Sequence, residues 1–342
     1  MIFLSSITLV LQYKLSLKLQ LWYTERQSTV NNREKVVEIV HSLAPGLAQR
    51  PTVLTMGKFD GLHLGHRQLI STAVRHARSL GFLSAVLTWE PHPNLILRPG
   101  TPPQLLSNLE EKIELIGSFD PDLLIIAPFT EATKTTSADA YLAQICAALP
   151  LRELWVGAGF AMGRDREGDV PNLMSIGQER GFAVGTASKV EIDGEVVSAS
   201  RVRELLATGH VERAAMLLGR PFGLRGTVVP GDQRGRVIGF PTANLEISPN
   251  HVMPADGVYA CRVLLDGMSL PAVTNVGLRP TFGMIQRTVE AHLLDWSGDI
   301  YGRTLQITFL HRLRSEQKFA GIEALIAQIR QDAEQARRLL IG

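Results

Sequence analysis

The sequence predicts two domains: an α/β domain built on a parallel sheet, followed by a small antiparallel β-barrel that ends in a C-terminal helix. The chain of 342 residues is longer than one typical domain. From residue 51 to about residue 200, strand-like apolar runs alternate with segments of helical periodicity, and from about residue 222 short strands follow one another across turn signals. We therefore expect an N-terminal extension over residues 1–50, the α/β domain over 51–220 and the barrel domain over 221–342.

The α/β domain is predicted from short runs that are apolar on both faces, namely Val53–Met56, Ala85–Thr88, Leu123–Ile126 and Glu153–Val156. Segments with apolar residues at helical spacing lie between them, over Leu64–Leu80, Leu109–Phe119 and Ala138–Leu149. Ser107 and Glu110 have the spacing of a capping box for the second of these helices. Strands of this kind, each followed by a helix, form a parallel sheet covered on both sides, and its ligands bind where the strands end.

The barrel domain is predicted from short strands separated by turns. Asp266-Gly267 lies between two strand-like runs and is a strong signal for a two-residue hairpin. Further strands are expected over Leu224–Val229, Thr288–Leu294 and Leu305–Leu310, and a total of about six antiparallel segments suits a small barrel. After Ser315, expected as an N-cap, one apolar stripe predicts a closing helix that packs against the barrel. The stripe consists of Phe319, Ile322, Leu325, Ile326 and Ile329.

Composition indicates a soluble globular protein, with 45% hydrophobic and 20% charged residues. The net charge of +2 is too small to argue for nucleic acid. The apolar N-terminus up to about Leu21 is interrupted by Lys14 and Lys18, so we expect a poorly ordered extension or an upstream start codon rather than a secretory signal. No later segment is apolar enough to predict a membrane span. The two cysteines lie far apart, which fits a cytoplasmic protein, and we expect a monomer or a weak homo-oligomer.

The first predicted strand leads into an H-x-G-H motif at the start of a helix, with the imidazoles of His63 and His66 on either side of Gly65. Free N–H groups and the helix dipole attract phosphate there, and imidazoles can donate to phosphoryl oxygens. A zinc pair is the alternative, but no third or fourth ligand is spaced accordingly. The strand before the motif and the helix after it favour nucleotide chemistry.

A second motif opens a helix about 130 residues later, where Ser198 and Ser200 precede Arg203. Serines at this position are most often N-caps. A cap together with an arginine in the first turn is also a way to hold a polyphosphate.

The most informative run is V-I-G-F-P-T-A-N-L over residues 237–245, which follows a glycine-rich, basic approach. Thr242 and Asn244 are two residues apart, so in extended backbone their side chains lie on the same face. A hydroxyl and an amide oxygen suit a Mg²⁺-bound polyphosphate. The alternative is an ordinary bend at a sheet edge.

Further along the chain, Glu290 lies in a run in which apolar and polar residues alternate. Its side chain faces either solvent on an edge strand or the mouth of the barrel.

These motifs, together with N-V-G-L-R-P-T-F over 275–282 and G-D-I-Y-G over 298–302, resemble the riboflavin kinase module. The resemblance runs from about Phe222 to the C-terminus and implies a small closed barrel with a C-terminal helix. It also implies that Gly239, Thr242 and Asn244 bind ATP, with Thr242 and Asn244 near Mg²⁺. Glu290 would be the base that deprotonates the 5′-hydroxyl of riboflavin.

The first half resembles the Rossmann-like nucleotidyltransferases that carry H-x-G-H and a serine/threonine-rich element followed by arginine. Joined to the kinase module, the whole resembles the bacterial bifunctional riboflavin kinase/FAD synthetases, from Thr52 to the end. The resemblance implies that His63 and His66 stabilise the transition state as FMN attacks the α-phosphorus of ATP. Residues expected to bind ATP are Gly57, Phe59, Asp60, Gly65, Ser198, Ser200 and Arg203, and those expected near the flavin are Pro91, His92, Pro93 and Arg166.

The chain departs from this family in three places. Trp89 stands where the family's F-x-P-H-P has Phe, and Ala199 stands at a usual Ser. Gly159 replaces the Asp or Asn of G-x-D-F-x-F-G, so it lacks a polar side chain that would help to hold the substrate. Either FAD synthesis is weakened by this glycine, or a water or a neighbouring residue fills the role. The alternatives to a bifunctional enzyme are a riboflavin kinase with a weak or inactive first domain and a non-catalytic flavin- or nucleotide-binding protein.

Overall fold

A computed structural model describes residues 37–341 of the chain, apart from residues 102, 232–234, 236–237 and 282–283. The expected extension up to residue 36 lies outside the described residues. So do Arg234 and Arg236 of the glycine-rich approach, Val237 at the start of the V-I-G-F-P-T-A-N-L run, and Phe282 at the end of the N-V-G-L-R-P-T-F run. By its internal contacts the chain divides into two units. The first ends at Glu204 and also contains Ser248–Met253, and the second comprises Leu205–Ile247 and the chain from Pro254 onward.

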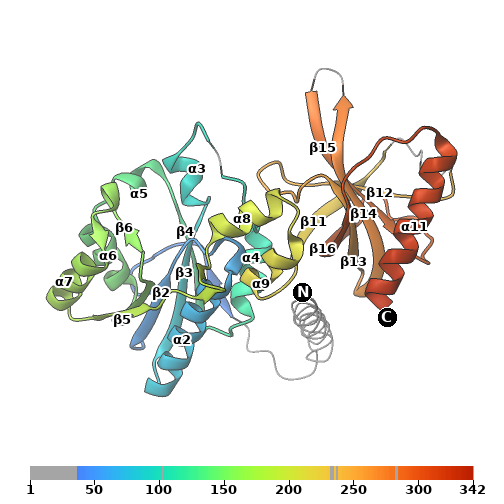
Figure 1. Cartoon of the computed structure of the whole chain (residues 1–342). Helices are drawn as coiled ribbons and strands as arrows, with labels where there is room; N and C mark the ends of the chain where they lie inside the picture. The colour runs from blue at the N-terminus through green and yellow to red at the C-terminus, as the bar shows by residue number, and fades with distance from the viewer. Residues whose placement is uncertain (1–36, 102, 232–234, 236–237, 282–283, 342) are drawn as a thin grey trace, which may run out of the picture. The chain divides into compact units, whose positions relative to one another are not determined.

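The first unit is built on a six-stranded parallel sheet of order β1-β4-β3-β2-β5-β8 (Figure 1). Its strands are β1 (Glu38–Val40), β2 (Thr52–Met56), β3 (Leu83–Glu90), β4 (Leu123–Pro128), β5 (Leu151–Gly157) and β8 (Ala183–Ala187). The expected four strands are thus confirmed, and β1 and β8 extend the sheet at its two edges. Because β1 pairs with β4, part of the expected extension belongs to the sheet.

Helices cover both faces of this sheet, as its strands of continuous apolar residues require. The helices of this unit are α2 (Leu64–Leu80), α3 (Pro93–Leu97), α4 (Leu109–Gly117), α5 (Glu131–Thr135), α6 (Ala138–Ala148), α7 (Val170–Arg180) and the part of α8 (Ala199–Ala207) up to Glu204. Four of them, α2, α4, α6 and α7, pack on the faces of the sheet. Leu54, Leu87 and Ile125 pack with α6 and α7 on one face. Val86, Leu124 and Ile126 pack with α2 and α4 on the other. Alternate residues of one strand therefore serve two separate cores.

The expected capping box of α4 is wrong by one residue. Asn108, not Ser107, is the N-cap, and its side chain exchanges hydrogen bonds with Glu111. The Ser107 hydroxyl instead accepts a hydrogen bond from the backbone N–H of Gly61 at 3.0 Å. Ser107 is therefore used to hold the loop after β2, while Asn, an equally good cap, starts the helix.

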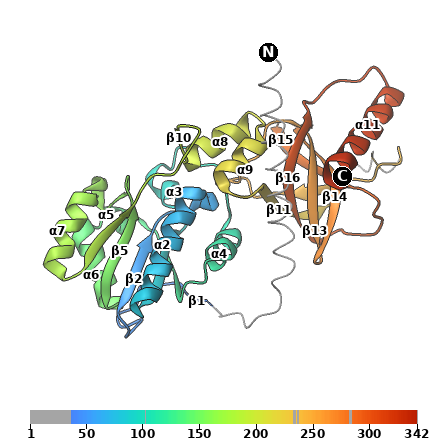
Figure 2. The same ribbon diagram turned by 60° about the horizontal axis from the view of Figure 1, so that its bottom comes forward.

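The second unit is a closed six-stranded barrel of order β11-β12-β15-β14-β13-β16, next to α9 (Val211–Leu218) and the C-terminal helix α11 (Ile322–Ile341) (Figure 2). The strands are β11 (Phe222–Val229), β12 (Ala243–Glu246), β13 (Gly257–Leu265), β14 (Met268–Thr281), β15 (Met284–Leu293) and β16 (Thr304–Arg314). The β13–β14 hairpin turns at Asp266 and Gly267, which both have positive φ as a type I′ turn needs. The fold class predicted from the sequence is confirmed.

The closing helix begins later than expected, at Ile322 rather than after Ser315. The Ser315 hydroxyl accepts a hydrogen bond from Arg312 at 3.2 Å instead of capping a helix. The helix reaches the barrel core mainly through Ala333, Ala336 and Leu340, whereas Ile322 of the predicted stripe is 60% exposed. Because two of the three residues at this contact are alanines, the helix backbone can approach the barrel closely. The larger residues of the predicted stripe are not needed for this contact.

Short elements complete the first unit near the carboxyl end of β5. They are the two-stranded pairs β6 (Ala161–Met162) with β7 (Gly168–Asp169) and β9 (Glu191–Ile192) with β10 (Glu195–Val196), and the 3₁₀ turns η1 (Asp60–Leu62) and η2 (Arg164–Arg166). No helix in the described part of the chain is long and apolar enough to cross a membrane.

Candidate active sites

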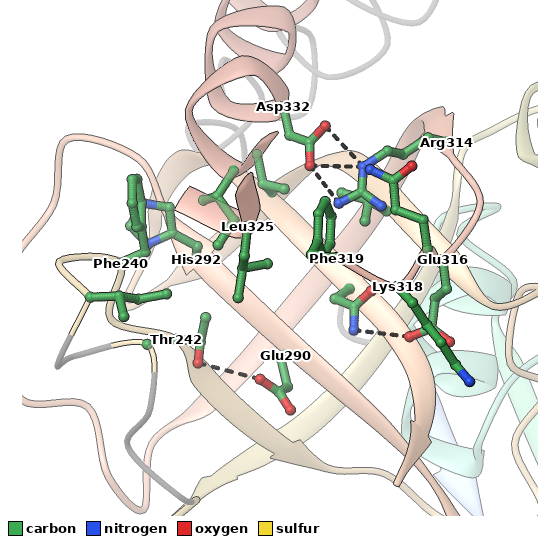
Figure 3. A pocket seen from close by; sticks show the side chains of 17 residues that line it. Phe240, Thr242, Glu290, His292, Arg314, Glu316, Lys318, Phe319, Leu325 and Asp332 are labelled. Atoms are coloured by element: carbon green, nitrogen blue, oxygen red, sulfur yellow. Dashed lines mark hydrogen bonds and ion pairs between the residues drawn. The ribbon is translucent and has the colours of Figure 1, made fainter. Parts of the chain in front are cut away.

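In the barrel, a carboxylate and two amides face one another across three neighbouring strands. Glu290 on β15 is paired directly with Asn244 on β12 and with Asn275 on β14. Directly paired residues of antiparallel strands place their side chains on the same face. Thr242, just before β12, reaches the same point, with its hydroxyl 3.5 Å from a carboxylate oxygen of Glu290 (Figure 3). The structure therefore brings Thr242, Asn244 and Glu290 together, as expected.

Because β15 lies between β12 and β14, Glu290 is not on an edge strand. Its half-buried side chain lines a pocket, so the alternative of a solvated edge is wrong. The P-T-A-N run is likewise no free edge, since β12 pairs with β11 and β15.

The glycines of the approach to P-T-A-N leave room for these side chains. A Cβ at Gly231 would lie 2.2 Å from the amide nitrogen of Asn244. A Cβ at Gly235 would lie 2.3 Å from the carbonyl oxygen of Phe240 and 3.4 Å from the hydroxyl of Thr242. Any larger residue at either position would displace the polar cluster or the loop that carries it. The glycine-rich spacing is thus a packing requirement of the site itself.

A pocket of about 580 Å³ opens beside Glu290. Phe319, Leu325 and Ile329 of the predicted stripe line it, so the stripe forms a pocket wall rather than a core contact (Figure 3). Arg314 binds the buried Asp332 through both Nε and Nη2 at 2.8–3.1 Å. The Arg314 guanidinium also lies 5.7 Å from the centre of the Phe319 ring, which holds the aromatic wall in place.

A second pocket of about 510 Å³ lies on the other side of Thr242. Trp296, Asp299 and Tyr301 line it, together with Pro241 and Leu293. Thr242 lines both pockets, whereas Glu290 lines only the first. A group transferred between molecules bound in the two pockets would therefore pass Thr242.

In the α/β unit, the H-x-G-H motif lies at the start of α2, where His63 is the N-cap. The rings of His63 and His66 stack with centroids 3.7 Å apart, and the Phe59 ring meets His66 edge-on at 5.3 Å. Burial is the main cause that holds the pKa of His66 well below its ordinary value, followed by the charge of a neighbouring imidazole and of Lys112. His66 is therefore neutral in this setting, so one of its ring nitrogens carries a hydrogen and can donate it.

A pocket of about 760 Å³ contains this pair. Predicted residues that line it are Gly57, Phe59, His63, Gly65, His66, Pro93, Arg166 and Ser198. Lys58 and Lys189 line it as well and were missed by the sequence reasoning. Burial, and then the positive charges of Arg166, Arg98 and Arg203, lower the pKa of Lys58. This concentration of cations suits a polyanionic ligand, although the net charge of the chain is small.

Five predicted residues lie outside this pocket lining: Asp60, Ser200, Arg203, Pro91 and His92. Arg203 binds the buried Asp60 carboxylate and the carbonyl oxygen of Gln104. Asp60 also accepts hydrogen bonds from the backbone N–H groups of Leu106 and Ser107. The ion pair of Arg203 and Asp60 therefore joins α8 to the loop after β2 and lies outside the pocket lining. His92 is buried, and its Nδ1 accepts from the N–H of Asn94 at 3.2 Å.

One wall of the same pocket is aromatic. Trp89, Phe129, Tyr141 and Phe160 line it, and none of these was chosen from the sequence as a site residue. Aromatic residues at the ends of strands and on helices are usually core, so only their convergence in space identifies the wall. Gly159 lies in the same lining, and a Cβ there would meet no atom within 4 Å.

Neither site shows a zinc-like cluster: within the described residues no group of three or more His, Cys, Asp or Glu side chains could hold a metal ion. The oxygen donors of Thr242, Asn244 and Glu290 are instead of the kind that Mg²⁺ prefers when phosphate oxygens complete its coordination.

Comparison with known proteins gives matches to two family models, one after the other along the chain. An FAD synthetase model matches residues 47–201 and a riboflavin kinase model matches residues 218–340. A bifunctional riboflavin kinase/FMN adenylyltransferase of Pseudomonas fluorescens is 38% identical over 89% of this chain and 97% of its own length. The protein of that name from Escherichia coli K12 is 37% identical over the same shares. A crystal structure of a macrolide-efflux protein from Streptococcus pneumoniae superposes with a TM-score of 0.80 at 28% identity, covering 88% of this chain and 99% of that one.

Proposed function

The chain belongs to the bifunctional riboflavin kinase/FMN adenylyltransferase family, and from this premise we propose which residues carry each of its two reactions. The enzyme phosphorylates riboflavin with ATP to give FMN and adenylylates FMN with ATP to give FAD. We assign the first reaction to the barrel cluster and the second to the pocket at the H-x-G-H motif. Matches to both family models support catalysis over a non-catalytic binding protein. The experiment described below distinguishes a bifunctional enzyme from a kinase with a weak or inactive first domain.

The position of Thr242 between two pockets is the observation that carries the kinase assignment. Riboflavin fits the pocket with Glu290 and the aromatic and aliphatic wall of Phe319, Leu325 and Ile329, because its ring system is large and flat. ATP then occupies the pocket lined by Trp296 and Tyr301, with its γ-phosphate at Thr242. Bound Mg²⁺ would neutralise phosphate charge, held by Thr242 and Asn244.

Glu290 is positioned to accept the proton of the riboflavin 5′-hydroxyl. The hydroxyl oxygen then forms a bond to the γ-phosphorus as the bond from that phosphorus to the bridging oxygen of ADP breaks. Asn275 is paired with Glu290 from the other side and also donates to Glu316 at 3.4 Å. This pairing sets the face of β15 from which the Glu290 side chain projects.

For adenylyl transfer, a phosphate oxygen of FMN attacks the α-phosphorus of ATP and pyrophosphate leaves. The N–H groups of His63 and His66 at the start of α2 would stabilise the added negative charge. Lys58, Lys189 and Arg166 line the same pocket and would bind the phosphates. The aromatic wall is the part of the pocket suited to the flavin ring, near Pro93. Five predicted residues lie outside the lining, namely Arg203, Asp60, Ser200, Pro91 and His92. Of these, Arg203 and Asp60 bind each other and would hold the loop after β2 in place for catalysis.

The substrates also suggest the setting of the enzyme. ATP is a cytoplasmic metabolite and both cysteines, Cys146 and Cys261, are free thiols. We propose that the protein acts in the cytoplasm as a monomer or weak homo-oligomer.

The direct test incubates the protein with riboflavin, ATP and Mg²⁺ and resolves the flavins by chromatography. We expect FMN to appear first and FAD to follow. FMN without FAD would mean that the first domain is inactive, and unchanged riboflavin would contradict catalysis altogether. Omitting Mg²⁺, with EDTA present, is expected to stop both reactions.

A further inference from the structure

His292 lies on the same face of β15 as Glu290, two residues further along the strand. Its half-buried ring lines the pocket beside Glu290 (Figure 3). The Nδ1 atom of His292 lies 2.8 Å from the carbonyl oxygen of Pro241, the residue before Thr242. A carbonyl oxygen can only accept a hydrogen bond, so Nδ1 carries a hydrogen and donates it. One strand therefore carries both the carboxylate of the proposed base and a donor to the backbone next to Thr242.

This hydrogen bond lies where the pairing of β12 with β15 stops. The pairs begin at Ala243 and Ala291, so the next pair in register would join Thr242 to His292. Thr242 instead precedes β12 and is not one of the paired residues. The His292 side chain binds the chain one residue earlier, at Pro241. A side chain thus holds the backbone at the point where the strand ladder no longer does.

Several constraints then determine how the chain approaches Thr242. The ring of Pro241 fixes φ of that residue. The hydrogen bond from His292 holds the carbonyl oxygen and thereby ψ, and because the peptide group is planar, the nitrogen and Cα of Thr242 follow. On the preceding residue, the N–H of Phe240 donates to the carbonyl oxygen of Gly235 at 2.8 Å, and its ring meets the His292 ring edge-on at 5.5 Å.

We propose that His292 is a positioning residue for phosphoryl transfer, which sets the Thr242 hydroxyl against the transferred phosphate through its hydrogen bond to the Pro241 carbonyl. The inference rests on the proposed function of Thr242 and Glu290 in the kinase site. His292 exchanges no proton with the substrate in this assignment. A small misplacement of a group at the reacting centre lowers the rate of transfer between bound molecules, so loss of the donor should lower kcat rather than raise the KM for riboflavin.

The first test separates the donor from the ring. His292→Phe keeps an aromatic edge beside Phe240 and removes the donor, whereas His292→Asn removes the ring and keeps an N–H near the place of Nδ1. In His292→Phe we expect kcat for riboflavin phosphorylation, measured as FMN plus FAD, to fall roughly fivefold to tenfold at a nearly constant KM for riboflavin, because one neutral hydrogen bond is lost. His292→Asn should recover most of the rate.

A matched control changes another histidine of the barrel. His311, on β16, pairs with Glu212 at 3.4 Å and lines neither of the two barrel pockets. His311→Phe should leave kcat and the KM for riboflavin intact. Equal losses in His292→Phe and His292→Asn would show that the ring rather than the donor matters, which would overturn the inference. A raised KM for riboflavin at normal kcat would also overturn it, because His292 would then serve binding and not transfer.

A double-mutant cycle with Thr242→Ala tests whether His292 acts through Thr242. We expect His292→Phe to cost little further rate once the Thr242 hydroxyl is absent. Purely multiplicative losses of rate would overturn the route through Thr242. A normal kcat in His292→Phe beside an impaired Thr242→Ala would overturn this inference alone. A normal kcat in Thr242→Ala would instead contradict the proposed kinase site itself.

The tautomer of His292 can be measured without substrate, metal or turnover. Nitrogen NMR of the protein labelled with ¹⁵N-histidine, at about pH 8 where an ordinary imidazole is neutral, shows which ring nitrogen carries the hydrogen. The signals absent from His292→Asn identify the residue. We expect the hydrogen of His292 on Nδ1. A hydrogen on Nε2 alone would overturn the inference, since Nδ1 could not then donate to Pro241, and this result does not depend on the folding of His292→Phe.

Discussion

At the scale of single residues, the kinase site depends on where one carboxylate points. The sequence showed Glu290 in an alternating run but left open whether it faces solvent, because alternation alone does not say which face is covered. The barrel closure decides this, since β15 has a neighbour on each side and Glu290 meets Thr242. The local sequence pattern does not show which way a side chain faces when its surroundings are determined by pairing between strands that are far apart in the sequence.

We expect Glu290→Gln to lower riboflavin phosphorylation by roughly 10²–10⁴-fold, because the amide cannot accept the proton of the 5′-hydroxyl. FAD formation from added FMN should continue at its normal rate, since it uses the other domain. Initial rates of both reactions on the same preparation check this. Kinase activity within a few-fold of the unaltered enzyme would show that Glu290 is not the base.

His92 gives a prediction for pH. Burial, and then the charges of Lys112, Lys58 and Arg203, lower the pKa of His92 to about 3. In the unfolded chain a histidine has a pKa of about 6.5, so below that pH the unfolded state binds a proton that the folded state refuses. The stability that neutral His92 contributes is present above about pH 6.5 and is lost as the pH falls toward 3.

Between pH 7 and pH 5 this one group should account for about 2 kcal/mol of lost stability. His92→Asn retains an acceptor for the N–H of Asn94 but cannot be protonated, so its stability should fall less steeply over the same range. Urea unfolding followed by tryptophan fluorescence at the two pH values measures the difference. Parallel pH dependences in the two proteins would contradict the burial of a neutral imidazole.

At the scale of elements, periodicity predicted the helices α2, α4 and α6 and the four central strands because their apolar patterns are strong and local. Edge strands β1 and β8 were not predicted, since they are short and pair through contacts far along the chain. The start of α11 was predicted too early, because Phe319 of the predicted stripe precedes the helix and lines a pocket. Similarly, Arg203 satisfied a motif, but its partner Asp60 was visible only in three dimensions.

The strand entry at β12 gives the third prediction. Thr242 and Asn244 flank one end of the Glu290 cluster, and Gly231 and Gly235 pack against them. Replacing both Thr242 and Asn244 by Ala should lower kinase turnover and weaken its response to Mg²⁺ together, because both oxygens are assigned to the metal–triphosphate unit. Titration of Mg²⁺ at saturating ATP checks this.

A matched control changes Thr227, which pairs with Glu246 on the neighbouring strand and has an exposed side chain. Thr227→Ala should leave both turnover and Mg²⁺ response intact. If the double variant also kept its Mg²⁺ response and its rate, the P-T-A-N run would only shape the barrel.

At the scale of the whole molecule, each chemistry has its own scaffold. The sheet is packed by separate apolar clusters on its two faces, and the barrel has its own contacts with α11. The sequence predicted this division because the two hydrophobic periods differ between its halves. It did not predict that Ser248–Met253, which follows β12, groups with the first unit. His251 of this segment is buried and meets Glu111 of α4 at 3.2 Å. No local pattern marks such a contact.

Separate scaffolds predict that the two reactions can be divided between two copies of the chain. The Glu290→Gln variant should make FAD from FMN but not from riboflavin. The His66→Ala variant should make FMN but lose most FAD synthesis, because removing one hydrogen-bond donor to a developing phosphoryl charge lowers the rate about 10²–10³-fold. An equimolar mixture should therefore convert riboflavin to FAD. FMN released by one copy has to reach the other, so FAD should appear after a lag that shortens as enzyme concentration rises. A time course of flavins resolved by chromatography measures both. If the mixture accumulated FMN without FAD, although each variant performed its own half-reaction alone, released FMN would not be the intermediate, and the two sites would have to act within one molecule.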